Sequence, residues 1–536
     1  MKIRSLLLAV GLGFGLAVVL LALLASPGPI ARADADIYYA REGGSGDCLA
    51  ATTPCSSVQR AINLAIAPSD EVWVATGIYT ENLVITHSVN LRGGWNVSFT
   101  AQSPVTYPTV VDGNGAHVVQ VDAASAEIEL YGFTLTDGKD GLNIDAGAVT
   151  VTQVTLSGIS RQAVDVDGGD ILVQQSVITD IQREGVQVEG GSVVVRDCVL
   201  ANVGYDASET RAGISVKGGN VRIEHTSLTS ATNEGVHILG GIVVLDDVTI
   251  AGTGHEGVQV EAGATSVLNC VIHDTLQEGI KISGTHTVDG NLVYDTDEHG
   301  IYVHDGAATV INNTVHDTIS DAIRIAAGSV VTVDGNIIYN AGDDCIEANG
   351  DRVLIANNRV DGCSDHGIKV QGVNQAYINA NRVYSANQAH IAGTAGIDLD
   401  NAGAFTVTNN IVADANGVSV LVENSAGPHN FIYHNTLVGG STGLVVSSPL
   451  TATLANNIIV SHTVGITATP GAVLAVSRAL LWGNGSDPIS GTGVITQAPL
   501  FVAPAAQDYH ILASSPAVNA GIEVGVSRDV DGDPRI

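Results

Sequence analysis

A glycine that follows a charged residue recurs at nearly constant spacing through the middle of this chain, at Gly185, Gly235, Gly257, Gly279, Gly300 and Gly367. Gly213, Ala322 and Cys345 hold equivalent positions, and from Gly213 onward the steps are 22, 22, 22, 21, 22, 23 and 22 residues. A period this strict predicts a solenoid, in which like residues of successive coils stack into columns. Residues after each glycine alternate, as in EGVQVEG at 184, so the first and third should point into a core and the second outward.

The first 33 residues have the composition of a signal peptide. Lys2 and Arg4 precede an apolar run to about Leu24, and Ala31-Arg32-Ala33 is a plausible cleavage site. The run is also long enough to remain as an anchor, which is the one membrane contact that we expect. The sequence therefore predicts a monomeric protein that is secreted or held at the cell surface.

The charge of the chain restricts its partners. Signal removal takes away three positive charges and no acid, so the formal charge moves from −33 to −36. Such a surface repels nucleic acid, and it repels anionic polymers unless local cations or bound metal intervene. No nucleic-acid partner is expected, whereas neutral glycans, or anionic ones bridged by calcium, remain open.

Residues 34–69 are expected to form an N-terminal cap. Apolar residues in the stretch 57–67 follow helical spacing, at Val58, Ala61, Ile62, Ala65 and Ile66. A helix there would cover the first coil, because an open solenoid end exposes its core and an unpaired strand edge. Cys48 and Cys55 lie close together in a Gly-rich loop and are expected to form a disulfide.

A column of asparagines runs beside the glycines, at positions 291, 313, 336, 358, 381, 410, 435 and 457. Asparagine tolerates the left-handed backbone of a tight corner and can bond its neighbours above and below. We expect these residues to turn the corners of the coils. Two insertions, YDASET from 205 and NQAHIAGTA from 387, should leave the stack as loops.

Strands of glycine and aliphatic residues, asparagine corners and 22-residue coils together resemble the right-handed parallel β-helix of the pectin lyase-like superfamily, over residues 70–497. The resemblance implies an all-β, single-stranded solenoid of about eighteen coils, each adding about 4.8 Å of height. Residues 498–536, with DYHI, SSPAVNAG and DVDGDPR, resemble the tail that follows many bacterial surface β-helices. The aspartates of DVDGD suit either a polar turn or calcium.

Polar side chains beside the glycines should stack about 5 Å apart on one outward stripe, a surface of the kind that binds sugar. The candidate substrate-binding residues are Glu278, Lys281, His299, Tyr302, Arg324, Glu347 and Lys369. A structural interpretation stays open, because exposed charges keep a long β-rod soluble and oppose lateral association. For the acids from Glu184 to Glu278, this structural interpretation is preferred to sugar binding.

Three strands, SDAIRI at 320, GDDCIEANG at 342 and CSDHGIKVQG at 363, resemble the signature strands of the polygalacturonases in order and spacing. The resemblance implies Asp343 as general acid, Asp321 and Asp344 as the carboxylates that activate water, His366 as a supporting group, and a disulfide between Cys345 and Cys363. Glycoside hydrolysis does need one protonated and one ionised carboxyl at the bond. The next strand, GIDLDN, departs from the family, because it has Asp398 and Asp400 where the family has an Arg-Ile-Lys strand.

Three functions thus remain open. The first is hydrolysis of a polysaccharide at Asp321, Asp343 and Asp344. The second is a non-catalytic rod that binds or adheres to a cell-surface glycan. The third is a pectate lyase-like reaction, which needs a cation such as calcium on the uronate and Lys or Arg as base. His255, His299 and His366 lack close metal-ligand spacing, so no metal site is assigned, and Ca²⁺ is the one cofactor left open.

Overall fold

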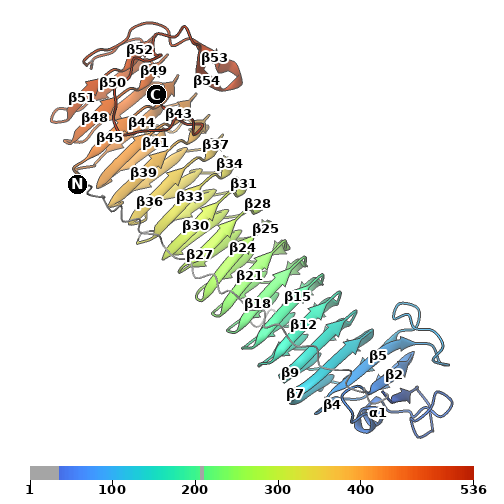
Figure 1. Ribbon diagram of the computed structural model, residues 1–536. Coiled ribbons are helices and arrows are strands. Elements are labelled where there is room, and N and C mark those ends of the chain that lie inside the picture. The colour runs from blue at the N-terminus through green and yellow to red at the C-terminus, as the bar shows by residue number, and fades with distance from the viewer. Residues whose placement is uncertain (1–34, 206–210, 327, 490, 536) are drawn as a thin grey trace, which may run out of the picture.

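The computed structural model describes residues 35–205, 211–326, 328–489 and 491–535 as one long parallel β-solenoid (Figure 1). The predicted signal peptide lies outside the described residues. Each regular coil contributes two strands to a large sheet, here called sheet A, and one strand to sheet B. One coil, for example, contains β23 (Val258–Val260), β24 (Ala264–Leu268) and β25 (Val271–Thr275). Val258 pairs with Ile280 of the next coil, which confirms the predicted 22-residue period.

The strand directly after each glycine opens its coil in sheet A. These strands are β11 (Val164–Val166), β14 (Val186–Val188), β17 (Ile214–Val216), β20 (Val236–Ile238), β23, β26 (Ile280–Ser283), β29 (Ile301–Asp305), β32 (Ile323–Ile325), β35 (Ile346–Ala348), β38 (Ile368–Gln371) and β41 (Ala395–Asp400). All of them pair in parallel with the equivalent strand of the neighbouring coil. Residues at one position of the repeat therefore form a straight column along the rod.

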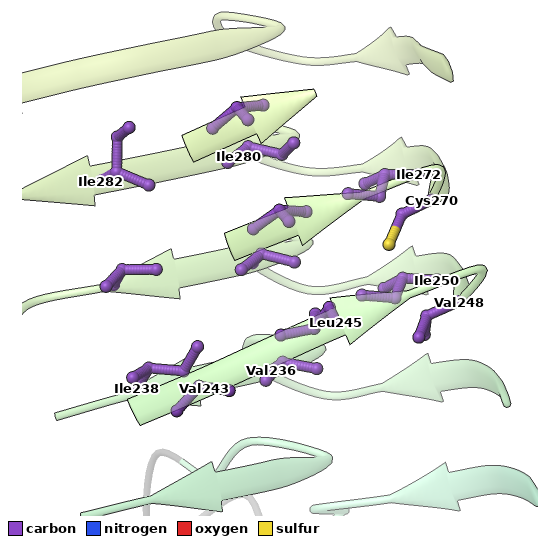
Figure 2. Close-up of a cluster of buried hydrophobic side chains, with 14 of the residues drawn as sticks. Val236, Ile238, Val243, Leu245, Val248, Ile250, Cys270, Ile272, Ile280 and Ile282 are labelled. Atoms are coloured by element: carbon purple, nitrogen blue, oxygen red, sulfur yellow. The ribbon is translucent and has the colours of Figure 1, made fainter. Parts of the chain in front are cut away.

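The core is built from the apolar positions that the alternation predicts. Val236 and Ile238 of β20 are fully buried and lie among Val243, Leu245 and Ile250 of the same coil (Figure 2). Glycine suits the position before most of these strands because the coils approach closely there, although alanine or cysteine occupies it in some coils, as at Ala322 and Cys345. A Cβ on Gly257 would lie 2.4 Å from Ile272 Cγ2 and 2.6 Å from the carbonyl oxygen of the next glycine in the column.

The asparagine column is confirmed as a hydrogen-bonded ladder. Asn336 Oδ1 accepts hydrogen bonds from both the main-chain N–H and the side-chain amide of Asn313, and the pattern repeats from 291 to 457. The prediction that the ladder asparagines themselves have the left-handed backbone is wrong, however. The left-handed conformation belongs to the residue directly before each ladder asparagine, such as Asn312 (φ 56°) and Asn357 (φ 55°). The ladder asparagines bond between coils, and their neighbours make the corner.

The N-terminal end carries the predicted helix, α1 (Val58–Leu64). Ser57 caps it by accepting a hydrogen bond from the main-chain N–H of Arg60. Its buried side chains pack near β1 (Ile37–Ala40), β2 (Glu71–Ala75) and β4 (Leu83–Ile85). Because β1 pairs in parallel with β2, sheet A already begins within the range predicted as the cap.

The tail folds back along the outside of the solenoid, so residues 526–532 lie against the coils that contain Asn357, Asn379 and Asn409 (Figure 1). Strands β53 (Phe501–Ala503) and β54 (Asp508–Ile511) form an antiparallel pair. Farther on, Arg382 Nη2 contacts Asp531 Oδ1 at 2.5 Å. Asp529 Oδ1 accepts the main-chain N–H groups of Asp531 and Asp533, which is the geometry of a polar turn. Among the described residues, no helix has the length and apolar character of a membrane span.

Candidate functional site

Two columns of side chains line the outer side of the strands that follow the glycines. The pre-glycine column contains Glu184, Ala212, Glu234, Glu256, Glu278, His299, Asp321, Asp344 and His366. The post-glycine column, two residues after each glycine, contains Gln187, Ser215, His237, Gln259, Lys281, Tyr302, Arg324, Glu347, Lys369 and Asp398. We call the surface formed by these two columns the polar face. Every substrate-binding residue predicted from the sequence lies on it.

The pre-glycine column is buried except for His299, which is half-buried, whereas the sequence predicts an exposed stripe. Glu256 and Glu278 are 2% and 3% exposed, and Asp321 is 0% exposed. Side chains of the post-glycine column contact them, as where Lys281 Nζ lies 2.7 Å from Glu256 Oε1 and 3.5 Å from Glu278 Oε1. The interpretation of these glutamates as solvated charges is therefore wrong, because they are buried beneath their neighbours.

Hydrogen bonds connect members of the pre-glycine column to the main chain of the next coil. Asp321 Oδ1 accepts the N–H of Asp344 at 3.0 Å, and Asp344 Oδ1 accepts the N–H of His366 at 2.8 Å. His299 Nδ1 accepts the N–H of Asp321 at 3.3 Å. Burial, with the charges of nearby Arg324 and Lys281, lowers the pKa of His299 to about 4, so this imidazole is neutral.

Charged groups concentrate between Asp321 and Asp398. Arg324 Nη1 lies 2.9 Å from Asp321 Oδ2 and also contacts Glu347. Lys369 Nζ lies 3.4 Å from Asp344 Oδ2. We call the group Asp321, Arg324, Asp344, Glu347, Asp365, His366, Lys369 and Asp398 the acid cluster. The acid cluster contains more acids than bases, and most of its carboxylates are buried.

His366 joins two coils of the acid cluster. Its Nδ1 lies 3.0 Å from Asp344 Oδ1, and its Nε2 lies 3.4 Å from Asp398 Oδ2. Burial lowers the pKa of His366, but the hydrogen bond to Asp344 and the surrounding carboxylates raise it overall. Burial raises the pKa of Asp398 to about 7. The titrations of His366 and Asp398 are therefore coupled, because the two groups are in contact.

The two carboxyls at the centre of the acid cluster have opposite pKa shifts. Burial, together with the charges of Asp344 and Glu347, raises the pKa of Asp321 to about 8. Burial also acts to raise the pKa of Asp344, but the hydrogen bond and charge of His366 and the charge of Lys369 lower it. The pKa values of two neighbouring carboxyls are thus pushed in opposite directions, a pattern that is concentrated at functional sites.

The predicted catalytic aspartates are divided between the interior and the surface. Asp321 and Asp344 converge with Glu347, since one carboxylate oxygen from each lies within 4.8 Å of the others. Asp343, the predicted general acid, is exposed. Burial, together with the charges of Asp344 and Asp365, still raises the pKa of Asp343. It lies next to Asp365, whose main-chain N–H donates to the Asp343 carbonyl at 3.1 Å.

Sequence reasoning missed Asp365 and assigned no role to Asp398. Asp365 precedes His366 as Asp343 precedes Asp344, so the repeat itself could have identified it. Asp398 pairs with Lys369 in the post-glycine column, whereas the family resemblance indicates it only as a departure from the Arg-Ile-Lys strand. Both predicted disulfides are formed, and the Cα atoms of Cys345 and Cys363 lie 5.4 Å apart.

Two groups in the acid cluster have metal-ligand geometry. They are Asp344 with Asp365 and His366, and Asp321 with Asp344 and Glu347. The carboxylate oxygens already contact side-chain cations, namely Arg324 and Lys369. Because calcium takes six to eight oxygen ligands, a bound ion would have to displace these cations. The donor set therefore fits an ion pair network better than a calcium site.

An aromatic column on sheet B was not expected. His273, Tyr294, His316 and Tyr339 stack with ring centroids 4.8, 5.1 and 4.4 Å apart and planes within 9° of parallel. Because the rings cover one another's faces, only their edges remain for a ligand. This column stabilises the stack and is a weaker candidate for sugar binding than the polar face.

The family model described as a right handed beta helix region matches residues 140–308 and 299–469, which together make more than half of the chain. The chain belongs to the right-handed β-helix family. This membership gives the solenoid its hand and agrees with the resemblance noted in the sequence. No curated protein sequence matches the chain.

Several solved structures are similar to this chain at low identity. The A-module of mannuronan C-5 epimerase AlgE4 from Azotobacter vinelandii is 11% identical, with 86% of this chain and 100% of that chain covered and a TM-score of 0.30. Pectate lyase Pel9A is 14% identical over 92% and 93% of the two chains, with a TM-score of 0.21. PfbA, a surface adhesin of Streptococcus pneumoniae, is 10% identical over 81% and 92%, with a TM-score of 0.24. Because the identities and TM-scores are low, these similarities do not support an argument about function, which must come from the residues of this chain.

Proposed function

We propose that this chain is an exported protein that binds an extended polysaccharide along the polar face. The supporting observation is the post-glycine column from Gln259 to Lys369, where donors, acceptors and an aromatic ring follow one another at a rise of about 4.8 Å per coil. Sugar hydroxyls both donate and accept hydrogen bonds, so a mixed row of this kind matches them. A regular polymer can repeat the same contacts from coil to coil.

The cations of this column are held in place by the acids beneath them. Lys281 contacts Glu256 and Glu278, Arg324 contacts Asp321 and Glu347, and Lys369 contacts Asp344. A side chain that is already ordered loses less conformational entropy when a ligand binds. The buried carboxylates thus have a role in binding even though they do not reach the surface.

Tyr302 provides the aromatic surface of the polar face. Its ring is partly exposed and lies 5.4 Å from the His299 ring and 5.8 Å from the His304 ring, centroid to centroid. An amphipathic ring of this kind can pack against the apolar face of a sugar while its hydroxyl bonds to it. We place the centre of the binding surface at Tyr302.

The test is affinity electrophoresis of the full chain through a panel of neutral and acidic polysaccharides, followed by calorimetry on any that retard it. Tyr302→Ala should weaken binding about tenfold, equivalent to about 1.4 kcal/mol. Tyr377→Ala is the matched control, because Tyr377 is an exposed tyrosine on β39 (Gln375–Asn379), away from the polar face. Equal binding by the two variants, or no retardation of the wild type, would refute the proposal.

Acid–base cleavage of the bound polysaccharide is the second candidate function. The opposite pKa shifts of Asp321 and Asp344 favour it, because a hydrolase needs one protonated and one ionised carboxyl. The exposures of 0% and 1% oppose it, because neither carboxyl reaches a substrate in this conformation. Only Asp343 combines a raised pKa with an exposed position in the predicted set.

A reducing-sugar assay on the retained polysaccharide separates binding from cleavage. A hydrolase should lose its product in Asp343→Asn and keep it in Asp295→Asn, an exposed aspartate on the sheet B strand β28 (Leu292–Thr296). Ultraviolet absorbance of an unsaturated product would indicate a lyase instead. Binding without new reducing ends would leave the chain as a glycan-binding rod.

A further inference from the structure

A pocket of about 190 Å³ interrupts the polar face near its N-terminal end. Its floor includes Ala212 and Ser215, which belong to the same coil. Around it lie charged and polar groups, among them Glu184, Arg211 and Glu234. No predicted site residue lines this pocket, and the binding column proposed above begins at Gln259, one coil beyond His237.

The pocket exists because one coil lacks the long side chains of its neighbours. In the pre-glycine column Ala212 stands between Glu184 and Glu234, and in the post-glycine column Ser215 pairs with Gln187 on one side and His237 on the other. The volume of two long side chains is therefore missing from a single coil. Because adjacent coils lie about 4.8 Å away on each side, the space is the height of one small ring rather than of a long chain.

The walls of the pocket are polar and already ordered. Arg211 Nη1 lies 3.0 Å from Glu184 Oε1, and Asn233 Nδ2 donates to Glu234 Oε2 at 2.5 Å. His237 Nε2 lies 3.0 Å from Glu261 Oε1. These contacts hold hydrogen-bonding groups at fixed positions, which lowers the entropy that a ligand loses on binding.

We infer that this pocket binds a single uncharged sugar unit of the polysaccharide, an inference that rests on the proposed function. Guanidinium, amide, hydroxyl and carboxylate groups can satisfy sugar hydroxyls, whereas an apolar ligand would leave them unpaired. Glu184 and Glu234 are 3% and 7% exposed and lie on opposite sides of the pocket. Arg211 and Lys217 also line the pocket, but Arg211 already contacts Glu184 and Lys217 contacts Glu189. A uronate carboxylate would have to compete with these acids for the cations, so the pocket discriminates against acidic sugars.

The position of the pocket makes its contribution depend on ligand length. Four coils separate Gly213 from Gly300, the glycine before Tyr302, which corresponds to about 19 Å along the rod. A trisaccharide cannot reach from the pocket to Tyr302, whereas a decasaccharide can. Occupying both regions with one molecule should therefore strengthen binding of the longer ligand.

The experiment uses calorimetry with the full chain and with cello-, xylo- and manno-oligosaccharides as trisaccharides and decasaccharides. Ala212→Glu restores the residue of the flanking coils and fills the pocket, and Ala212→Ser is its matched control. For the neutral decasaccharide that binds best, Ala212→Glu should weaken binding about tenfold and Ala212→Ser less than about twofold. Trisaccharide binding at Tyr302 should be unchanged in both variants.

Each result then decides one proposal. If Tyr302→Ala weakens decasaccharide binding and Ala212→Glu does not, the pocket inference fails while the proposed function stands. If no polysaccharide or oligosaccharide binds the wild type, both fail. Tighter binding of an oligogalacturonide decasaccharide than of every neutral one would overturn the assignment to an uncharged sugar. Should Ala212→Glu not fold, as judged by circular dichroism, Ser215→Gln fills the same space from the other column.

Discussion

Removing one side chain of the asparagine ladder should weaken the rod far more than removing an exposed asparagine. Asn336 is fully buried, and its Oδ1 accepts the main-chain N–H of Asn313 at 2.9 Å and the Asn313 amide at 3.0 Å. Its own amide donates to the carbonyl of Val310 at 3.0 Å and to Asn358 Oδ1 at 2.9 Å. The variant Asn336→Ala loses all four bonds at once.

The magnitude follows from the partners that remain. The Asn313 amide still donates to Val288, and Asn358 Oδ1 still accepts the main-chain N–H of residue 336. The main-chain N–H of Asn313 is left buried without its hydrogen-bond acceptor, at a cost of about 1–3 kcal/mol, and the other three lost bonds add about 1 kcal/mol each. We therefore expect Asn336→Ala to lower the free energy of unfolding by roughly 4 to 6 kcal/mol.

Urea unfolding followed by circular dichroism measures this loss, and hydrogen exchange at the Asn313 amide localises it. The control is Asn340→Gly. Asn340 is exposed, makes one bond of 3.2 Å to Asp317, and has a φ of 56° that glycine adopts without strain. Its replacement should cost less than about 1 kcal/mol. If both variants lose the same stability, or the Asn313 amide stays protected in Asn336→Ala, the ladder does not stabilise the rod in the way described.

Three further outcomes are expected. Because folding raises the pKa of His366, its protonated form stabilises the protein fully below pH 6.5, the ordinary pKa, and this contribution is lost as the pH rises through the raised pKa. Folding lowers the pKa of Asp344, so its ionised form stabilises the protein fully above pH 3.8 and this contribution is lost in stronger acid. His366→Gln should thus lower the melting temperature most between these two values and least in alkaline solution; a pH-independent difference would contradict this. Cys345→Ala opens a disulfide with a sequence separation of 18 and should cost about 3 kcal/mol in denaturant unfolding, an effect that reduced wild type should reproduce. Gly257→Ala brings a Cβ to 2.4 Å from a core methyl and should cost about 1–3 kcal/mol, whereas Gly168→Ala meets nothing closer than 3.5 Å and should be nearly neutral in the same measurement.

Much of the architecture follows from the repeat alone. The spacing of the charged glycines yields the coil length, and alternation after each glycine identifies core residues such as Val236 and Ile238. The asparagine phrases locate the ladder, although not which neighbour has the left-handed backbone. These features are predictable because each coil repeats the same local pattern and meets only similar coils.

The candidate site depends on distances that the repeat does not encode. Asp321 and Asp344 were expected on an outward stripe, but hydrogen bonds to the next coil and the side chains of Arg324 and Lys369 enclose them. Asp343, one residue away from Asp344, is exposed. Which acid is protonated therefore depends on burial and on neighbours in other coils.

The order of the residues thus establishes which side chains share a column, because the period and the alternation are properties of the chain itself. Only the stacked coils decide which members of a column are buried, which carboxylates converge and where a small residue such as Ala212 leaves a pocket. The reason is physical. Burial, pKa and free volume depend on how far each side chain reaches toward the coils above and below it.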